Sequence, residues 1–429
     1  MPKLLAVLFG TANNSYAFMG VFEGGAALLD EAVEWFMEKG GAKYKHEHGM
    51  GHHASRDDLM SLPVIGMIDR CDGPSTDWDE MPAHDISDTW WKRFNGVSDN
   101  DSIHIPALYI DSWFDYGVAE TLFMCNLFQH NAPNQTSRNN QYCIIYPTKH
   151  CCFGDATDSM YVDGLFLGDA RLDNFAVYLK WCDYWLKKKE NSIFDMPRIQ
   201  YYVMGKNVWR QADEWPPAEV VFKQFDLTGH QDASDVKVQQ TLALSRGRNI
   251  DLTTIVYDPE DPAPSYAWPG EVNDDLLRGR PDILIFESIN LEKPIEVTGP
   301  VVLVLYVSSS AKDTDFIARL LDVTPDGKTH LLTQGSLRMR FRQGFDREVF
   351  MARDSVYKVE INLKATSYVF SAGHKIRLDI SSSDFPRLTR NLNTGGDNYQ
   401  DTVWTTAVNK IYHSKEYPSH LTLPVMLQY

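Results

Sequence analysis

Between residues 106 and 189, short apolar runs alternate with longer stretches in which apolar residues recur every three or four positions. The runs PALYI (106–110) and YCIIY (142–146) have no polar interruption and predict buried strands. The stretches VAETLFMCNLFQH (118–130) and LDNFAVYLKWCDYWLKKK (172–189) have helical spacing, and the second ends in lysines, which favour the carboxyl end of a helix. Strands that alternate with helices of this length predict βαβ units and a parallel sheet.

After Pro197 the pattern changes to short strands that are separated by glycine, proline and aspartate. These runs are rich in the β-branched and aromatic residues that favour strands, with turn residues between them. They include RIQYYVMG, VVLVLYVSSS, FIARLLDVTPDG, SVYKVEINL and KIRLDISSS. Residues 197–429 are therefore predicted to be all-β, as a sandwich or jelly roll.

Residues 23–104 have a third sequence pattern, with helical runs such as GAALLDEAVEWFMEKG, many aromatics and prolines, and no clear strand. We interpret this stretch as a helical cap that is inserted over the active edge of the sheet. The sheet domain would then comprise residues 1–22, in which LLAVLF is a candidate strand, and residues 105–196. The predicted fold class is α/β plus all-β.

The composition is that of a globular protein, with 43% hydrophobic residues and no apolar run near the roughly 18 to 20 residues that span a membrane. The 58 acidic residues outnumber the 41 basic ones, which gives a formal charge of −17. Nucleic acids and anionic membranes are bound through basic patches, and none is evident, so we expect neither partner. The cellular compartment stays open.

The cysteines show no repeated CxxC spacing of the kind that holds zinc. We interpret them as mostly reduced core residues, although their even number leaves disulfides open. The six are Cys71, Cys125, Cys143, Cys151, Cys152 and Cys182.

A polar side chain follows each of the two predicted strands. Asp115 comes after PALYIDSWF, and His150 comes after YCIIYPTK. In α/β-hydrolases the catalytic triad follows the chain order nucleophile, acid, histidine. An aspartate after a strand can also be a helix cap, and a histidine can be a surface loop residue, but the ordered pair favours the triad.

Four stretches of the second half carry a resemblance to a known family. They are YDPEDPAP (257–264), RPDILIFES (280–288), VTGPVVLVLYVSSSAKDTDFIARLLDVTPDG (297–327) and FSAGHKIRLDISSSDFPRLTRNLNTG (370–395). Together they resemble the C-terminal jelly-roll domain of the CocE/NonD hydrolases, a family that includes cocaine esterases, α-amino-acid ester hydrolases and Xaa-Pro dipeptidyl-peptidases. With the segments around Asp115 and His150, the resemblance covers most of residues 105–429 and, more loosely, residues 1–40.

The resemblance implies a role for both polar residues. Asp115 matches the triad aspartate in the family's G-W-Y-D stretch, and His150 matches the histidine of its G-P-W-x-H stretch. Two positions depart from the family: Ser112 stands where a glycine is usual, and YPTKH replaces the glycine and tryptophan before the histidine. The implied activity is acyl transfer to water from a small ester or amide, Xaa-Pro dipeptides included, with no cofactor and no metal.

The nucleophile of the triad is missing from this pattern. A nucleophile elbow requires a strand, a G-x-S-x-G type turn with small neighbours, and a helix behind it. Ser15 in FGTANNSYAFMG is a candidate, but Asn13 and Asn14 stand where small residues are required. PKLLAVLFGTANNSYAFMGVFEGGAAL is instead similar to the family segment that follows the elbow helix. We therefore expect the serine to lie outside this chain, which alone would be inactive.

This interpretation also predicts a partner. The sheet would contain the last three parallel strands of an α/β-hydrolase sheet, and LLAVLF would expose its hydrogen-bonding edge. Because such edges aggregate or pair with other chains, we expect a companion polypeptide carrying the amino-terminal half, or a homo-oligomer. The alternative function is that of a truncated, non-catalytic homologue that binds a carbohydrate or protein partner through its jelly roll.

Two clusters could suggest a metal ion. A solvated cap loop is the preferred interpretation of the first cluster, and sandwich strands with a turn are preferred for the second. The first contains His46, His48, His52 and His53 near Asp57 and Asp58, and the second contains Asp313, Asp315, Asp322 and Asp326.

The vicinal cysteines after His150 could form a Cys–His nucleophile pair. However, adjacent residues at a strand end are expected to point in different directions. We therefore keep the serine hydrolase as the leading prediction.

Overall fold

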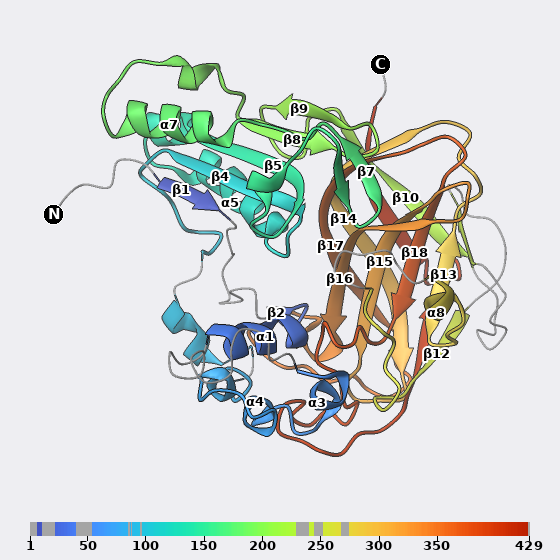
Figure 1. Ribbon diagram of the computed structural model, residues 1–429. Coiled ribbons are helices and arrows are strands. Elements are labelled where there is room, and N and C mark those ends of the chain that lie inside the picture. Colours follow the sequence, from blue (N-terminus) through green and yellow to red (C-terminus); the bar gives the residue numbers. More distant parts are fainter. Residues whose placement is uncertain are drawn as a thin grey trace.

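The structure is a computed structural model, in which a small sheet, a β-sandwich and a helical segment can be followed in Figure 1. It describes residues 7–10, 22–39, 54–84, 86, 88–94, 97–228, 240–243, 252–266 and 274–427. Ser15 and the four histidines between residues 46 and 53 lie outside these ranges.

The small sheet has the strand order β1-β4-β5-β8-β9. The strands β1, β4, β5 and β8 run parallel, and β9 pairs antiparallel with β8 at the far edge. The bounds are β1 (Val7–Gly10), β4 (Ala107–Phe114), β5 (Gln141–Lys149), β8 (Ile199–Val203) and β9 (Val208–Ala212).

Helices cover both faces of the sheet, as βαβ connections require. Helix α5 (Val118–Asn131) packs in one cluster with Tyr109 and Cys143, whereas Trp181 of α7 (Asn174–Trp185) packs in another with Leu108 and Ile144. Neighbouring residues of β4 thus point to opposite faces, and both faces are buried. This arrangement explains the uninterrupted apolar runs that predicted β4 and β5.

The sheet differs from the prediction at its second edge. The sequence places the stretch RIQYYVMG in the all-β half, but β8 pairs in parallel with β5, so four strands are parallel instead of three. The prediction failed because an apolar strand can pair with the edge of either sheet. The sequence of the strand does not determine which sheet it joins. Short elements complete this region: α6 (Gln135–Asn139), η3 (Phe153–Asp155), the hairpin β6 (Met160–Val162) and β7 (Leu165–Gly168), and η4 (Ser192–Asp195).

The second half forms a β-sandwich. Its strands are connected in the order β12-β19-β14-β20-β10-β11-β13-β18-β15-β16, with β17 also paired to β14, and all pairs are antiparallel except β11–β13. The bounds are β10 (Val220–Thr228), β11 (Gln240–Ala243), β12 (Leu252–Tyr257), β13 (Ile283–Glu287), β14 (Ile295–Ser309), β15 (Asp315–Val323), β16 (Thr329–Arg338), β17 (Tyr357–Phe370), β18 (Lys375–Ser381), β19 (Ala407–Tyr412) and β20 (His420–Met426); α8 (Asp274–Arg278) and η5 (Met339–Phe341) are its short helices.

Among the described residues between β1 and β4 the longest elements are helices, and these lie beside one end of the sandwich (Figure 1). This segment also contains a hairpin of two short strands, with two residues in each, that the sequence did not predict. The elements are β2 (Phe22–Glu23), β3 (Ala26–Ala27), α1 (Leu29–Lys39), α3 (Arg56–Met60), α4 (Met67–Arg70), η1 (Trp78–Glu80) and η2 (Thr89–Phe94).

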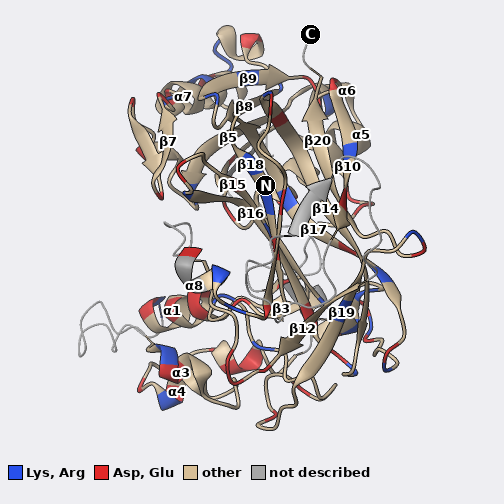
Figure 2. Cartoon of the chain, turned by 90° about the vertical axis from the view of Figure 1, so that its right-hand side faces the viewer, with Lys and Arg blue, Asp and Glu red and all other residues tan. Residues whose placement is uncertain are grey.

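The helical segment shares a core with the sandwich. Its buried Phe22, Trp78 and Trp91 lie in one hydrophobic cluster with Phe341 and Phe385 of the sandwich. Helix α1 begins with acidic residues, visible as red segments in Figure 2, which suit the positive end of a helix dipole. None of the helices among the described residues combines the length and the apolar character needed to cross a membrane.

Candidate active site

The two predicted site residues lie side by side because β4 and β5 are adjacent parallel strands. The last residue pair in register is Phe114 with Lys149, so Asp115 and His150 are the next residues beyond each strand. Parallel strands end at the same edge of their sheet, which brings two side chains 35 positions apart in sequence into contact.

A short hydrogen bond joins the pair. His150 Nδ1 lies 2.7 Å from Oδ2 of Asp115, whose other oxygen, Oδ1, accepts the Gly117 N–H at 2.8 Å. The Asp115 side chain is fully buried, whereas 36% of the His150 side chain is exposed. The aspartate is thus a fixed, shielded acceptor, whereas the imidazole that it holds is partly exposed.

The surroundings raise the pKa of His150 above its usual 6.5. The hydrogen bond to Asp115 is the largest cause and favours the imidazolium, while partial burial opposes it. The carboxylate of Glu31, in the first turn of α1, adds in the same direction. The site therefore stabilises the charged imidazolium that a general base forms when it accepts a proton.

Tyr116 covers one face of the imidazole. The two rings stack with centroids 4.7 Å apart and an interplanar angle of 23°, and the phenol oxygen lies 3.4 Å from Nε2. Burial raises the pKa of Tyr116, so its hydroxyl keeps its proton. Stacking restricts the rotation of a ring that is otherwise held at a single nitrogen.

A second carboxyl, Asp111, lies behind the pair and was not identified from the sequence. It is buried, accepts the Ser112 N–H at 2.7 Å, and accepts the hydroxyl of Thr121. Burial and the nearby charge of Asp115 both raise the pKa of Asp111, which favours its protonated form. The available signal was a single acid inside the apolar strand PALYIDSW.

The structure corrects the expectation about Cys151. Its Sγ lies 3.3 Å from His150 Nε2, although the two residues are adjacent in sequence. The backbone of Cys151 is left-handed, with φ of 58°, and this turns the thiol back over the imidazole. None of the six cysteines, all within the described ranges, forms a disulfide; Cys71, Cys125 and Cys143 are buried, and Cys151 is exposed.

No serine within the described ranges donates a hydrogen bond to His150, whose Nε2 contacts are Tyr116 and Cys151. The candidate Ser15 lies outside those ranges, so its distance from His150 stays untested. Of the histidine-rich cluster interpreted as a solvated cap loop, Asp57 and Asp58 are described, and the Asp58 carboxylate accepts the Ser55 N–H in a capping box of α3. Nowhere in the described ranges do three or more His, Cys, Asp or Glu side chains form a group that could hold a metal ion.

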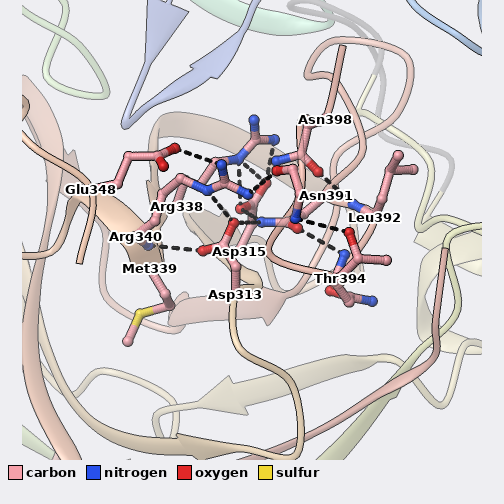
Figure 3. A network of polar contacts seen from close by, with 12 residues as sticks. Asp313, Asp315, Arg338, Met339, Arg340, Glu348, Asn391, Leu392, Thr394 and Asn398 are labelled. Atoms are coloured by element: carbon pink, nitrogen blue, oxygen red, sulfur yellow. Dashed lines mark hydrogen bonds and ion pairs between the residues drawn. The ribbon is translucent and has the colours of Figure 1, made fainter. Parts of the chain in front are cut away.

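Two of the four aspartates that could suggest calcium, Asp313 and Asp315, are paired with arginines (Figure 3). Of the other two, Asp322 contacts His374 and Asp326 lies 4.0 Å from Lys328. Asp315 accepts hydrogen bonds from Arg338 at 3.0, 3.3 and 2.9 Å, and Asp313 accepts one from Arg340 Nε at 2.7 Å. Asn391, from the turn-rich TRNLNTGG stretch, donates to both carboxylates. These buried charges are therefore neutralised within the protein, and TRNLNTGG is a structural part of the sandwich.

A parallel sheet with an acid and a histidine at its carboxyl edge is typical of the α/β class of hydrolases. Residues 191–422, more than half of the chain, match the X-Pro dipeptidyl-peptidase C-terminal non-catalytic domain. The chain therefore belongs to that family, within the CocE/NonD group of hydrolases, as its sequence stretches predicted.

Known proteins support this membership over nearly the whole chain. Cocaine esterase from Rhodococcus sp. (strain MB1 Bresler) is 31% identical over 386 residues, which are 87% of this chain and 64% of that protein. An aminopeptidase from the marine sediment archaeon Thaumarchaeota archaeon has a similar structure, with a TM-score of 0.82 at 21% identity; the match covers 99% of this chain and 73% of that one.

A CocE/NonD family hydrolase from Staphylococcus aureus matches with a TM-score of 0.63 at 17% identity, over 99% of this chain and 68% of that one. These structural matches establish the shared fold. The chain spans less than two thirds of the length of cocaine esterase.

Proposed function

We propose that this chain supplies the acid and the histidine of a serine hydrolase that transfers the acyl group of a small ester or amide to water. The observation that carries the proposal is the 2.7 Å contact between His150 Nδ1 and Asp115, at neighbouring strand ends. Membership of a hydrolase family, with an esterase at 31% identity, supports it.

In this mechanism Asp115 accepts the Nδ1–H of His150, which leaves the Nε2 lone pair free to take a proton. Nε2 would accept the proton of an attacking serine hydroxyl and later return it to the leaving group. Asp115 stabilises the imidazolium between those two steps, in agreement with the raised pKa of His150. Ester or amide substrates, Xaa-Pro dipeptides included, are the substrate class implied by the family.

We further propose the finer architecture that the family implies: an α/β-hydrolase sheet from residues 1–22 and 105–196, a cap from 23–104, and a jelly roll from 197–429. The influence of Glu31 on His150 supports a cap that reaches the site. The pairing of β8 with β5 would shift the last boundary beyond residue 196.

The attacking hydroxyl, in this proposal, comes from a companion polypeptide whose strands continue the sheet beside β1. Among the described strands, β1 ends the sheet on that side and pairs with β4 alone. A further strand could therefore add there through backbone hydrogen bonds.

The test is the reaction of the purified chain with a p-nitrophenyl ester and with a fluorophosphonate, which labels activated serines. We expect no phosphonate-sensitive turnover and no labelled serine. A fluorophosphonate adduct on Ser15 that disappears in His150→Gln would overturn the proposal of a companion polypeptide. It would support His150 as the base. Phosphonate-sensitive turnover that is unchanged in His150→Gln would contradict the role of His150.

A further inference from the structure

The described residues already contain a continuous chain of groups from a carboxylate to a nucleophilic atom. Asp115 Oδ2 lies 2.7 Å from His150 Nδ1, and His150 Nε2 lies 3.3 Å from the Sγ of Cys151. This is the arrangement of nucleophile, base and orienting acid that activates thiols in acyl transfer. The thiol is exposed, so a reagent in solution can reach it.

The backbone holds the thiol in this position. The Cys152 N–H donates to the Lys149 carbonyl at 3.0 Å, which closes a tight turn with His150 and Cys151 at its two central positions. Cys151 has φ of 58°, in the left-handed region that glycine and asparagine favour in such turns. Strained non-glycine residues of this kind cluster at functional sites, because the surrounding structure must enforce them.

We propose that Cys151 is a second nucleophile of this site, which is S-acylated by activated aryl esters and thioesters with His150 as its base. The Sγ proton moves to Nε2, and Sγ forms a bond to the acyl carbon. The bond from that carbon to the leaving oxygen or sulfur breaks, and the imidazolium returns the proton to the leaving group. No oxidant, reductant or metal is required.

The neighbouring Cys152 provides a built-in comparison. It precedes the same short helix η3 and differs from Cys151 by a single position, but it is partly buried. Burial, followed by the charge of Asp155, raises the pKa of Cys152, which disfavours its thiolate. The two thiols therefore differ in contact with the imidazole and in exposure, within one molecule.

The inference rests on the proposed function, since it uses the same base, but it has its own readout. Purified chain is mixed with p-nitrophenyl acetate, and the acetylated cysteines are identified by peptide mass spectrometry over time. We expect acetylation of Cys151 ahead of Cys152 and Cys182, with about one equivalent of p-nitrophenolate released per chain. His150→Gln should slow the acetylation of Cys151 by about 100-fold, the lower range for general-base catalysis.

The internal comparison keeps the test decisive even if a variant folds poorly. Cys152→Ser is the matched control and should leave the acetylation rate of Cys151 as it is. Equal rates at Cys151, Cys152 and Cys182 in the wild-type chain would overturn the inference, as would an unchanged Cys151 rate in folded His150→Gln.

The serine proposal has a different readout, which is the fluorophosphonate adduct. An inert Cys151 would overturn the inference about the thiol and leave the fluorophosphonate result standing.

Discussion

His150 is held at Nδ1 and on one ring face, and its other nitrogen, Nε2, contacts the Tyr116 hydroxyl and the Cys151 thiol. Asp115 fixes Nδ1 and Tyr116 stacks on the ring. This division selects one tautomer, with the proton on Nδ1 and the lone pair on Nε2. The geometry is therefore suited to proton transfer at Nε2, whether the donor is a serine hydroxyl or the Cys151 thiol.

Asp111 should make the protein less stable as the pH rises. Its pKa is raised in the folded state, so above the ordinary value of 3.8 the folded protein binds a proton that the unfolded chain has lost. The free energy of unfolding then decreases with pH across the window above 3.8. Asp111→Asn, which mimics the neutral acid, should remove this decrease and be the more stable protein at pH 7.

Urea unfolding of both proteins at several pH values from 4 to 7 checks this prediction. Parallel stability curves for wild type and Asp111→Asn would show that Asp111 is ionised in the folded state. The measurement is independent of any catalytic activity.

The residues of the site differ in how far sequence could identify them. Asp115 and His150 follow apolar strands in the triad order, and this order together with the family-like stretches around them predicted the pair. Tyr116 and Asp111 gave no comparable signal, because their roles depend on ring stacking and on the burial of one acid in β4. The direction of the Cys151 side chain was predicted wrongly, because the sequence contains no direct sign of a left-handed backbone.

At the scale of elements, the hairpin β2–β3 depends on a close approach to β16. Gly24 has φ of 58°, and a Cβ placed there would lie 1.9 Å from the carbonyl oxygen of Ser336. Nearby, the Arg338 N–H donates to the Gly24 carbonyl at 2.8 Å. The helical segment thus contacts the sandwich through the backbone of Gly24, at a point where there is no room for a side chain.

Gly24→Ala should destabilise the protein more than the matched substitution Gly327→Ala. Gly327 is also left-handed, with φ of 89°, but a Cβ added to it would meet no atom within 4 Å. Gly327→Ala should cost about 1 to 2 kcal/mol for the backbone alone. The steric conflict at Gly24 should add about 1 to 3 kcal/mol, measured by urea unfolding. Equal losses would show that the hairpin moves away from β16 freely.

The strands β15 and β16 are joined by the buried pair Asp315 and Arg338 (Figure 3). Arg338→Met removes the cation and leaves a buried carboxylate, which should lower the free energy of unfolding by about 3 to 5 kcal/mol. Lys328→Met is the control, because Lys328 is 71% exposed and lies 4.0 Å from Asp326, and its loss should change stability little. Similar stabilities of the two variants in urea would contradict this role of the pair.

Element types were more predictable than element partners. Uninterrupted apolar runs identified β4 and β5, helical spacing identified α5 and α7, and the glycine- and proline-punctuated runs identified the β-rich half. The placement of β8 could not be predicted, because it depends on a hydrogen-bonding edge that β5 presents only after folding.

At the scale of the whole molecule, the three parts share cores and buried charges. One hydrophobic cluster extends from Tyr109 of the small sheet to Leu303 of the sandwich. Glu23, in the hairpin of the helical segment, accepts two hydrogen bonds from Arg387 and forms an ion pair with Lys364. We therefore expect the parts to depend on one another for stability.

Glu23→Gln tests this dependence through its response to pH. Burial alone would raise the pKa of Glu23, but Arg387 and Lys364 together hold it well below its ordinary 4.5. The carboxylate thus contributes stability that is present above pH 4.5 and lost as the pH falls below it. Glu23→Gln should cost about 2 to 3 kcal/mol at pH 7, the range for hydrogen bonds to charged groups.

The cost should shrink progressively below pH 4.5, as followed by urea unfolding at pH 7 and pH 3.5. A cost that stays constant across this range would show that Glu23 does not act through its charge.

The central claim is that Asp115 orients His150 as the proton acceptor of the site. The most direct measurement is NMR of the chain with ¹⁵N-labelled histidine, titrated as wild type and as Asp115→Asn. We predict that neutral His150 carries its proton on Nδ1, that its pKa lies above 6.5 in the wild type, and that the variant lowers this pKa. A His150 with its proton on Nε2, and a pKa that does not change in Asp115→Asn, would contradict the account.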